Sequence, residues 1–187
     1  LREDLASLGV GGYSLRAERI RKQGFAATQF EVHIEAVDRP HRHLKHIREI
    51  VENGRLPGAV CERAMAIFTR LAEAEAEAHG TSVEKVHFHE VGAIDSIVDI
   101  VGACVALHRL GIEEVHCSPI PTGGGTLCCD HGVMPVPAPA TARLLKGVPL
   151  AACEEMSELT TPTGAAILTT VARSFGPLPA MVMDRIG

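Results

Sequence analysis

The residues best suited to metal chemistry lie at a predicted junction between a strand and a helix. His87 and His89 are two apart on the predicted strand, so their side chains share one face and stand about 7 Å apart along it. Asp95 and Asp99 are four apart at the start of the predicted helix, so they project in the same direction. Imidazoles and carboxylates together suit nickel, zinc, manganese or iron. We therefore predict a metal site at this junction.

The same junction has a structural alternative. Glu90 joins the metal group only if the strand ends there. Asp95 or Ser96 could instead cap the helix, with Ser96 and Asp99 in the spacing of a capping box, and Asp99 could simply favour the helix dipole. The two histidines could equally be exposed strand residues. Spacing alone leaves both interpretations open.

A second group of histidines lies at the start of another predicted helix, Arg42 to Asn53. His43 and His46 are three apart, so their side chains share one helix face, and His41 lies just ahead of them. Paired imidazoles can hold a divalent cation. Such a pair is also common on a solvated helix face. We take His41 and His43 as candidate ligands.

Three segments could bind an anion such as a phosphate group. The turn from Gly123 to Gly125 follows a predicted strand and would let backbone amides approach a ligand. Thr161, Thr163 and Gly164 open a predicted helix, whose free amides and positive dipole end attract anions. His131 precedes a proline-rich run. A plain tight turn, a threonine cap followed by proline and an ordinary turn residue are the respective structural alternatives.

The elements that position these residues follow from hydrophobic periodicity and from turn residues. A short helix over 1–8 precedes a hairpin of strands 13–21 and 25–37 that turns at Gln23 and Gly24. We expect further helices over 42–53, 57–78, 97–110, 138–146 and 163–173, and further strands over 86–91 and 114–120. Helices and strands intermix without a repeat or a linker. This pattern predicts one α+β domain, residues 1–187, with a mixed sheet packed against helices.

Composition excludes several classes of protein. The net charge is -5 and aromatic residues make up 3%, so neither a basic face nor stacking rings point to nucleic acid. No apolar run is long enough to span a membrane. The six cysteines include no C-x-x-C pair, which disfavours a zinc ribbon or a thioredoxin-like site. We expect reduced thiols, no disulfide and a cytoplasmic location.

Four segments, in order along the chain, resemble the motifs of the LarC family of nickel insertion proteins. They are His41–Leu44, Val86–Ala93 with Asp95–Gly102, His131–Gly132 with Pro135–Thr141, and Thr161–Ala166. The resemblance implies insertion of nickel into pyridinium bisthiocarboxylic acid mononucleotide, the pincer cofactor of lactate racemase and its relatives. It implies a lyase-class nickel chelatase that cleaves CTP with magnesium or manganese.

The resemblance also implies partners and an extent. The partners are the small-molecule cofactor precursor and the racemase that receives the finished cofactor, while a homo-oligomer stays open. We expect this chain to be the N-terminal and central part of such a protein, lacking an acidic glycine-rich start and a C-terminal nucleotide domain. We expect it to bind nickel weakly without completing insertion. From the residues alone, a metallohydrolase and a non-catalytic nickel-binding module are the alternatives.

Overall fold

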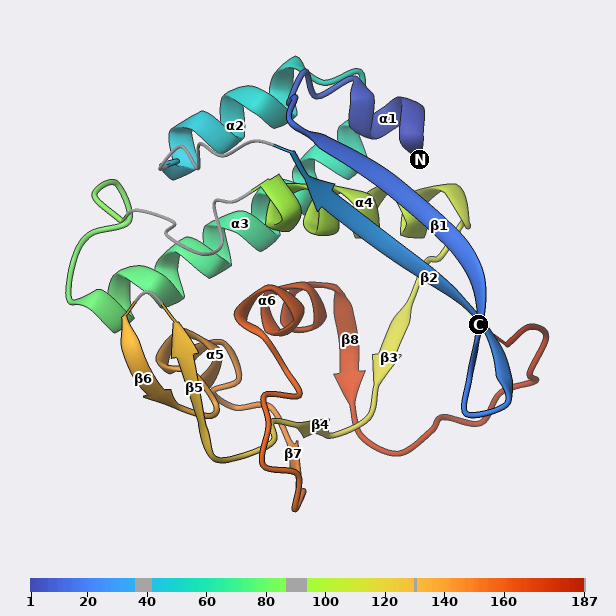
Figure 1. The fold of residues 1–187 in the computed structure, drawn as a ribbon, viewed down its shortest axis with the longest axis vertical. Helices are drawn as coiled ribbons and strands as arrows, with labels where there is room; N and C mark the ends of the chain where they lie inside the picture. The colour runs from blue at the N-terminus through green and yellow to red at the C-terminus, as the bar shows by residue number, and fades with distance from the viewer. Residues whose placement is uncertain (36–41, 87–93, 130, 187) are drawn as a thin grey trace.

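The protein is built around one long helix, as the computed structural model shows for residues 1–35, 42–86, 94–129 and 131–186 (Figure 1). α3 contacts α2, α4, α5 and α6, while α1 packs on α4. The helices are α1 (Arg2–Ala6), α2 (Leu44–Asn53), α3 (Gly58–His79), α4 (Ile94–Arg109), α5 (Pro139–Leu144) and α6 (Pro162–Val171).

The core lies where α3 meets its neighbours. Phe68 of α3 and Ile97 of α4 are fully buried, as is Ile47 of α2. Burying a side chain of this size stabilises the fold by about 1.5–3 kcal/mol. Ala165 and Ala166, also fully buried, present only methyl groups, so α6 can approach α3 closely. α3 ends at Gly80, whose φ of 62° is the left-handed conformation that glycine adopts readily.

The predicted hairpin is confirmed. β1 (Tyr13–Lys22) pairs antiparallel with β2 (Phe25–Ile34), and the turn residues Gln23 and Gly24 both have positive φ, at 50° and 89°. Such a turn matches the twist of the two strands. Near its base the hairpin packs on the core, and its tip extends beyond the helices (Figure 1).

The other strands form three short pairs. β3 (Val115–Cys117) runs parallel to β8 (Ala172–Phe175), β4 (Ile120–Pro121) parallel to β7 (Leu150–Ala151), and β5 (Thr126–Cys129) antiparallel to β6 (Gly132–Pro135). The α+β class is therefore confirmed, and the strands of the described residues form four two-stranded sheets. The predicted strand 114–120 is divided into β3 and β4. Pro119 lies between them and has no N–H to donate to a continuous ladder.

One predicted helix start is wrong. α4 includes Ile94, three residues before the predicted start, so Ser96 lies inside the helix and is 7% exposed. The capping box of Ser96 and Asp99 is therefore wrong as well. The predicted strand 86–91 lies almost wholly outside the described residues, and its one described residue, Val86, is not in a strand.

Two further sequence-based predictions concern the cysteines and the membrane. All six cysteines are free thiols in the structure. Among the described helices, none is both long enough and apolar enough to cross a membrane.

Candidate functional site

A cavity of about 270 Å³ lies between α4 and the N-terminal end of α6, and we call it the α4–α6 cavity. Its lining comes from six parts of the chain: α4, β5, β6, the N-cap of α5, the segment that leads into α6 and the first turn of α6. The lining residues are Asp95, Ser96, Asp99, Leu127, Met134, Ala138, Glu158, Thr161, Pro162 and Thr163.

The α4 wall carries two of the predicted metal ligands. Asp95 and Asp99 both line the cavity, as their four-residue spacing predicted. Burial raises the pKa of the Asp99 carboxyl, and the negative charge of Asp95 raises it further. Asp95 also has a structural role, because one of its carboxylate oxygens accepts a hydrogen bond from the Ser96 N–H at 2.8 Å. The two carboxylates favour a positively charged ligand on this side.

The opposite wall is the first turn of α6. The Thr161 hydroxyl accepts a hydrogen bond from the Gly164 N–H at 3.2 Å, which makes Thr161 the N-cap of the helix. Pro162 has no N–H, so the Thr163 amide and the positive end of the helix dipole are what α6 offers to an anion. Thr160 donates a hydrogen bond to the Pro121 carbonyl at 2.8 Å and so anchors this segment. Gly164 therefore donates the capping hydrogen bond to Thr161, and it is absent from the cavity lining.

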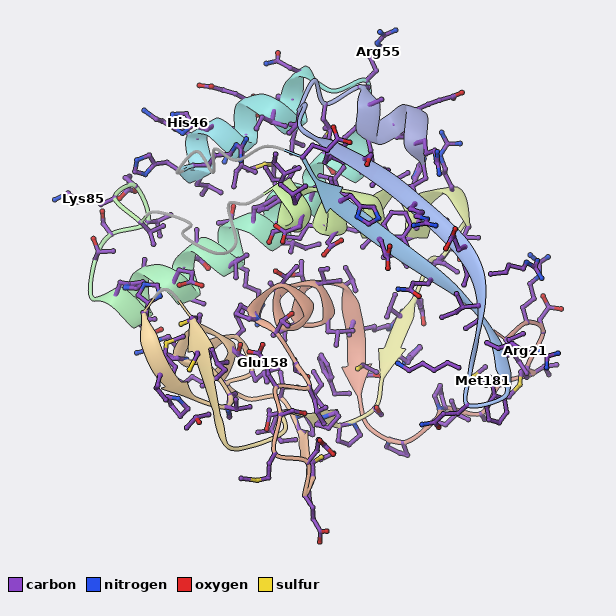
Figure 2. All side chains as sticks on the ribbon, in the orientation of Figure 1. Arg21, His46, Arg55, Lys85, Glu158 and Met181 are labelled. Carbon is purple, nitrogen blue, oxygen red and sulfur yellow. The ribbon has the colours of Figure 1, made fainter. Side chains whose placement is uncertain are left out.

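A third carboxylate, Glu158, enters the cavity from the segment before α6, where Figure 2 labels it. Its position depends on the glycine turn, because Gly123 forms an isolated bridge with Glu158. A β-carbon on Gly123 would overlap the Ser157 carbonyl oxygen, and it would lie only 3.2 Å from the Leu159 nitrogen. A β-carbon on Gly125 would make a tight contact with the Met156 carbonyl oxygen, at 3.3 Å, without overlapping it. The two glycines thus hold the chain that carries Glu158, and neither lines the cavity.

The floor of the cavity is apolar. Leu127 of β5 and Met134 of β6 are cross-strand partners in one hairpin, so both side chains lie on the same sheet face. The Met134 thioether, beside the Leu127 side chain, is suited to contact with an aromatic ring of a ligand. The cavity therefore joins an acidic wall, an apolar floor and the positive end of a helix, and no Lys or Arg is among its described lining residues.

The described histidines of the predicted group at the start of α2, His43 and His46, lie outside this cavity. His43 lies at the start of α2, with its Nδ1 3.0 Å from the Val86 carbonyl oxygen. His46 has a capping role, since its Nδ1 accepts a hydrogen bond from the His43 backbone N–H at 3.2 Å. His43 is thus fixed beside the residue that precedes His87 in the chain. The other predicted ligands of the two groups, His41, His87, His89 and Glu90, lie outside the described residues.

His131 does not join the cavity either. It lies at the turn between β5 and β6, against His79 at the end of α3, with 5.0 Å between the ring centres. Within the described ranges, no three His, Cys, Asp or Glu side chains already form a group that could hold a metal ion.

Sequence reasoning missed Glu158, Leu127 and Met134. Glu158 shows no periodicity, and the two apolar residues belong to strands of four residues each. The triple glycine of residues 123–125 gave an indirect signal for Glu158, because glycine allows another segment of the chain to pass close by.

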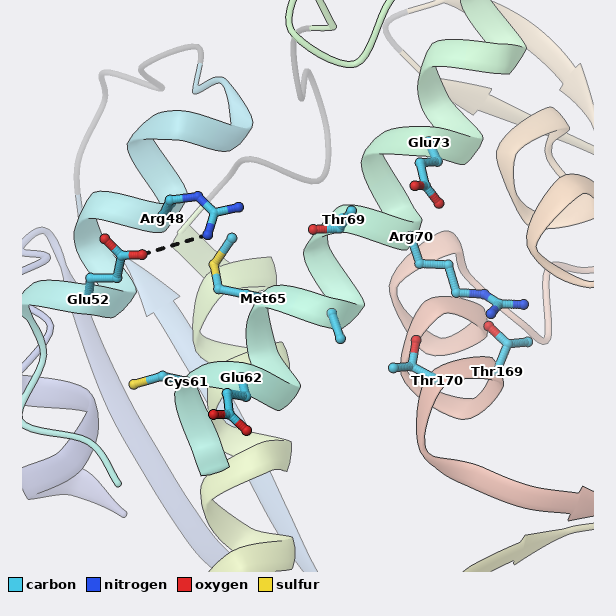
Figure 3. A pocket seen from close by; sticks show the side chains of 11 residues that line it. Arg48, Glu52, Cys61, Glu62, Met65, Thr69, Arg70, Glu73, Thr169 and Thr170 are labelled. Carbon is cyan, nitrogen blue, oxygen red and sulfur yellow. Dashed lines mark ion pairs between the residues drawn. The ribbon is translucent and has the colours of Figure 1, made fainter. Parts of the chain in front are cut away.

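A larger cavity, of about 650 Å³, opens between α2, α3 and α6 (Figure 3). Arg48 and Glu52, an ion pair at 3.6 Å, lie on its α2 side, and Thr169 and Thr170 lie on its α6 side. None of the residues that the sequence singled out for chemistry lines it. Size alone favours this cavity, but the convergence of carboxylates with a helix N-terminus favours the smaller one, and we place the candidate site there.

Comparison with known proteins gives a consistent family. The chain matches the family described as "Nickel insertion protein" over residues 1–187. Proteins from two strains of Desulfitobacterium hafniense are each 50% identical over 188 residues, covering 100% of this chain and 46% of the relative. Both are named pyridinium-3,5-bisthiocarboxylic acid mononucleotide nickel insertion protein. The chain thus spans just under half the length of these relatives. No solved structure matches it.

Proposed function

Because the chain belongs to the nickel insertion protein family, we propose that its α4–α6 cavity binds the pyridinium mononucleotide that receives nickel. The single observation that carries this proposal is the pairing of an acidic wall with a helix N-terminus across one small cavity. The ligand named for the relatives has a cationic pyridinium nitrogen and a phosphate group, which suit these two ends, and it also carries two thiocarboxylic acid groups.

Each part of that ligand has a counterpart in the lining. The positive ring nitrogen suits the carboxylates of Asp95, Asp99 and Glu158, with the two thiocarboxylates of the ring directed away from them. The ring face suits contact with Leu127 and Met134. The phosphate suits the Thr163 amide and the dipole of α6, which act together at a helix N-terminus. The cavity volume of about 270 Å³ lies just below the usual range of about 300–1,000 Å³ for ligand sites, so part of a mononucleotide would extend outside it.

Nickel is the cargo of the proposed reaction. We propose that His87, His89 and Glu90 hold it, because these residues precede Asp95 of the cavity wall closely in sequence and because imidazole and carboxylate ligands bind nickel. The thiocarboxylate sulfurs of the acceptor are softer ligands, so transfer from nitrogen and oxygen to sulfur is favourable. His43, fixed beside Val86, supports the proposal that the two histidine groups act together.

The remaining features of the family activity are also proposals for this chain. We propose a lyase-class chelatase that uses CTP with magnesium or manganese in the longer protein. The α4–α6 cavity offers one helix N-terminus, which suits a single phosphate group rather than a triphosphate. Six free thiols support a cytoplasmic location.

Nicotinamide mononucleotide is a suitable probe, because it has a pyridinium ring and a phosphate but no metal-binding sulfur. We expect calorimetric titration to show binding that weakens about tenfold or more in Asp99→Asn and when the phosphate is removed from the probe. Glu62→Gln, which alters the larger cavity, is the control and should bind as the unmodified chain does. Equal affinity for the probe with and without its phosphate would exclude the proposed orientation.

A further inference from the structure

The larger cavity between α2, α3 and α6 carries polar side chains that the proposed function does not use. We call it the α2–α3–α6 cavity, and its volume of about 650 Å³ lies within the usual range of about 300–1,000 Å³ for small-molecule sites. Met65 and Ala66 lie midway along the part of α3 that lines it and give it an apolar floor. Arg70, Thr169 and Thr170 lie together on the side of α6 (Figure 3).

Arg70 is the arginine of this cavity that has no partner within the described part of the chain. Arg48, on the α2 side, forms its ion pair with Glu52 at 3.6 Å. Glu73 is three residues from Arg70 on the same helix, a spacing that permits an ion pair, yet the two side chains form none. Figure 3 shows the Arg70 side chain extending from α3 toward α6 instead. Its planar fork of N–H donors therefore lies at the cavity, available to a carboxylate.

The Thr170 hydroxyl is a second polar group without a partner among the described residues, and its oxygen is buried. The preceding residue behaves differently. The Thr169 hydroxyl donates a hydrogen bond to the Ala165 carbonyl at 2.7 Å, which is a common bond for threonine inside a helix. A buried hydroxyl without a hydrogen bond is unfavourable, so a ligand oxygen that pairs with Thr170 is stabilised by contact with it.

We propose that the α2–α3–α6 cavity binds a small organic carboxylate, held by the Arg70 guanidinium and the Thr170 hydroxyl. Met65 and Ala66 contact the apolar body of this ligand. The inference is independent of the proposed nucleotide function, because no residue that lines this cavity also lines the α4–α6 cavity.

The other charges of the lining favour a carboxylate over a phosphate ester. Glu73 is close to Arg70 in the helix, and Glu62 lies about 12 Å from it along the helix axis. These two carboxylates repel a dianion about twice as strongly as a monoanion. Arg48 already compensates the third carboxylate, Glu52, through their ion pair.

Benzoate and phenyl phosphate are suitable probes, because they share one apolar ring and differ in the charge of the head group. In a titration followed by nuclear magnetic resonance, benzoate should shift the Arg70 Nε–H and Thr170 amide signals and leave the Asp99 and Thr163 amides unchanged. We expect phenyl phosphate to bind more weakly. Benzoate that shifts neither the Arg70 nor the Thr170 signal would overturn the proposal, and tighter binding of phenyl phosphate would overturn the choice of a carboxylate.

Two arginine variants separate a specific contact from general attraction. Arg70→Gln should weaken benzoate binding about tenfold or more, because it removes charged hydrogen bonds to the ligand. Arg48→Gln removes the same charge from the opposite side of the same cavity, and its effect should be clearly smaller. Equal weakening in the two variants would mean that benzoate responds only to the charge of the cavity, and the proposed site would be refuted.

Thr170→Val tests the hydroxyl in a variant that keeps the shape of the side chain. Without ligand, it should raise the thermal midpoint, because it removes a buried hydroxyl that has no partner in the described chain. It should also weaken benzoate binding. Thr169→Val is the matched control, because it loses the bond to Ala165 and should lower the midpoint with a smaller effect on binding. A lower midpoint in Thr170→Val, or equal benzoate affinities of the two variants, would remove Thr170 from the site.

Discussion

Replacing Gly123 with alanine tests whether the glycine turn holds the third carboxylate of the cavity. Gly123 has φ of 77°, where alanine is strained by about 1–2 kcal/mol. The new β-carbon would also overlap the Ser157 carbonyl oxygen and lie 3.0 Å from its carbonyl carbon. Those neighbours are backbone atoms that no rotamer change can move, so overpacking adds about 1–3 kcal/mol. We expect a total loss of about 2–5 kcal/mol of unfolding free energy.

Two neighbouring glycines provide matched controls. Gly132 has φ of 86° but open space around it, so Gly132→Ala should lose only the strain of about 1–2 kcal/mol. A β-carbon on Gly124 would lie 3.5 Å from its nearest neighbour, which is an ordinary contact. Gly124→Ala should therefore change stability by less than about 1 kcal/mol.

Urea unfolding followed by far-ultraviolet circular dichroism suits this comparison, because the chain has no tryptophan. In Gly123→Ala the chain around Glu158 must shift, so binding of nicotinamide mononucleotide should weaken along with stability. Equal losses of unfolding free energy in Gly123→Ala and Gly132→Ala would refute this reasoning. They would mean that only the positive φ matters and that the close contact of Gly123 with Ser157 does not.

Three other predictions concern stability. Thr161→Ala should lower the stability of the protein by about 1 kcal/mol because it removes the N-cap of α6, and Thr161→Ser should retain this stability. Equal thermal midpoints for the two variants would contradict the capping role. The Thr141 hydroxyl is fully buried and has no hydrogen-bond partner in the described part of the chain. Thr141→Val should therefore stabilise the protein by about 1 kcal/mol. A lower unfolding free energy of the variant in urea would indicate a hidden partner of the hydroxyl. Hydrogen bonds from Arg109 hold the pKa of Asp4 well below 3.8, so Arg109→Gln should destabilise the protein at neutral pH. The difference in unfolding free energy between the variant and the unmodified chain should close as the pH falls below 3.8, because Asp4 then becomes protonated. A difference that persists in acid would mean that packing, not charge, is lost.

The parts of the fold that the sequence predicted are those with local signals. The hairpin β1–β2 follows from alternation and from the Gln23–Gly24 turn, and α3 follows from its apolar stripe. The start of α4 was misplaced because Asp95 and Ser96 are both good capping residues, and tertiary burial of Ser96 overrode that local preference.

The candidate site was predicted only in part, for a similar reason. Asp95, Asp99, Thr161 and Thr163 were found because each acts within its own helix start. Glu158 reaches the cavity through a bridge to Gly123, and such long-range pairing leaves no periodic trace in the sequence. The meeting of His79 with His131 is of the same kind.

The two parallel strand pairs described above have a consequence for the order of folding. β3 pairs Val115 with Ala172, and β4 pairs Ile120 with Leu150, so each ladder closes a long stretch of chain to gain only a few hydrogen bonds. Closing such loops is entropically unfavourable and slow, whereas α3 and the β1–β2 hairpin need only nearby residues. The segments that line the α4–α6 cavity, from Leu127 to Thr163, lie within or between these loops. We therefore expect the cavity to be among the last parts of the molecule to form, so that a ligand that fills it would select chains that have finished folding.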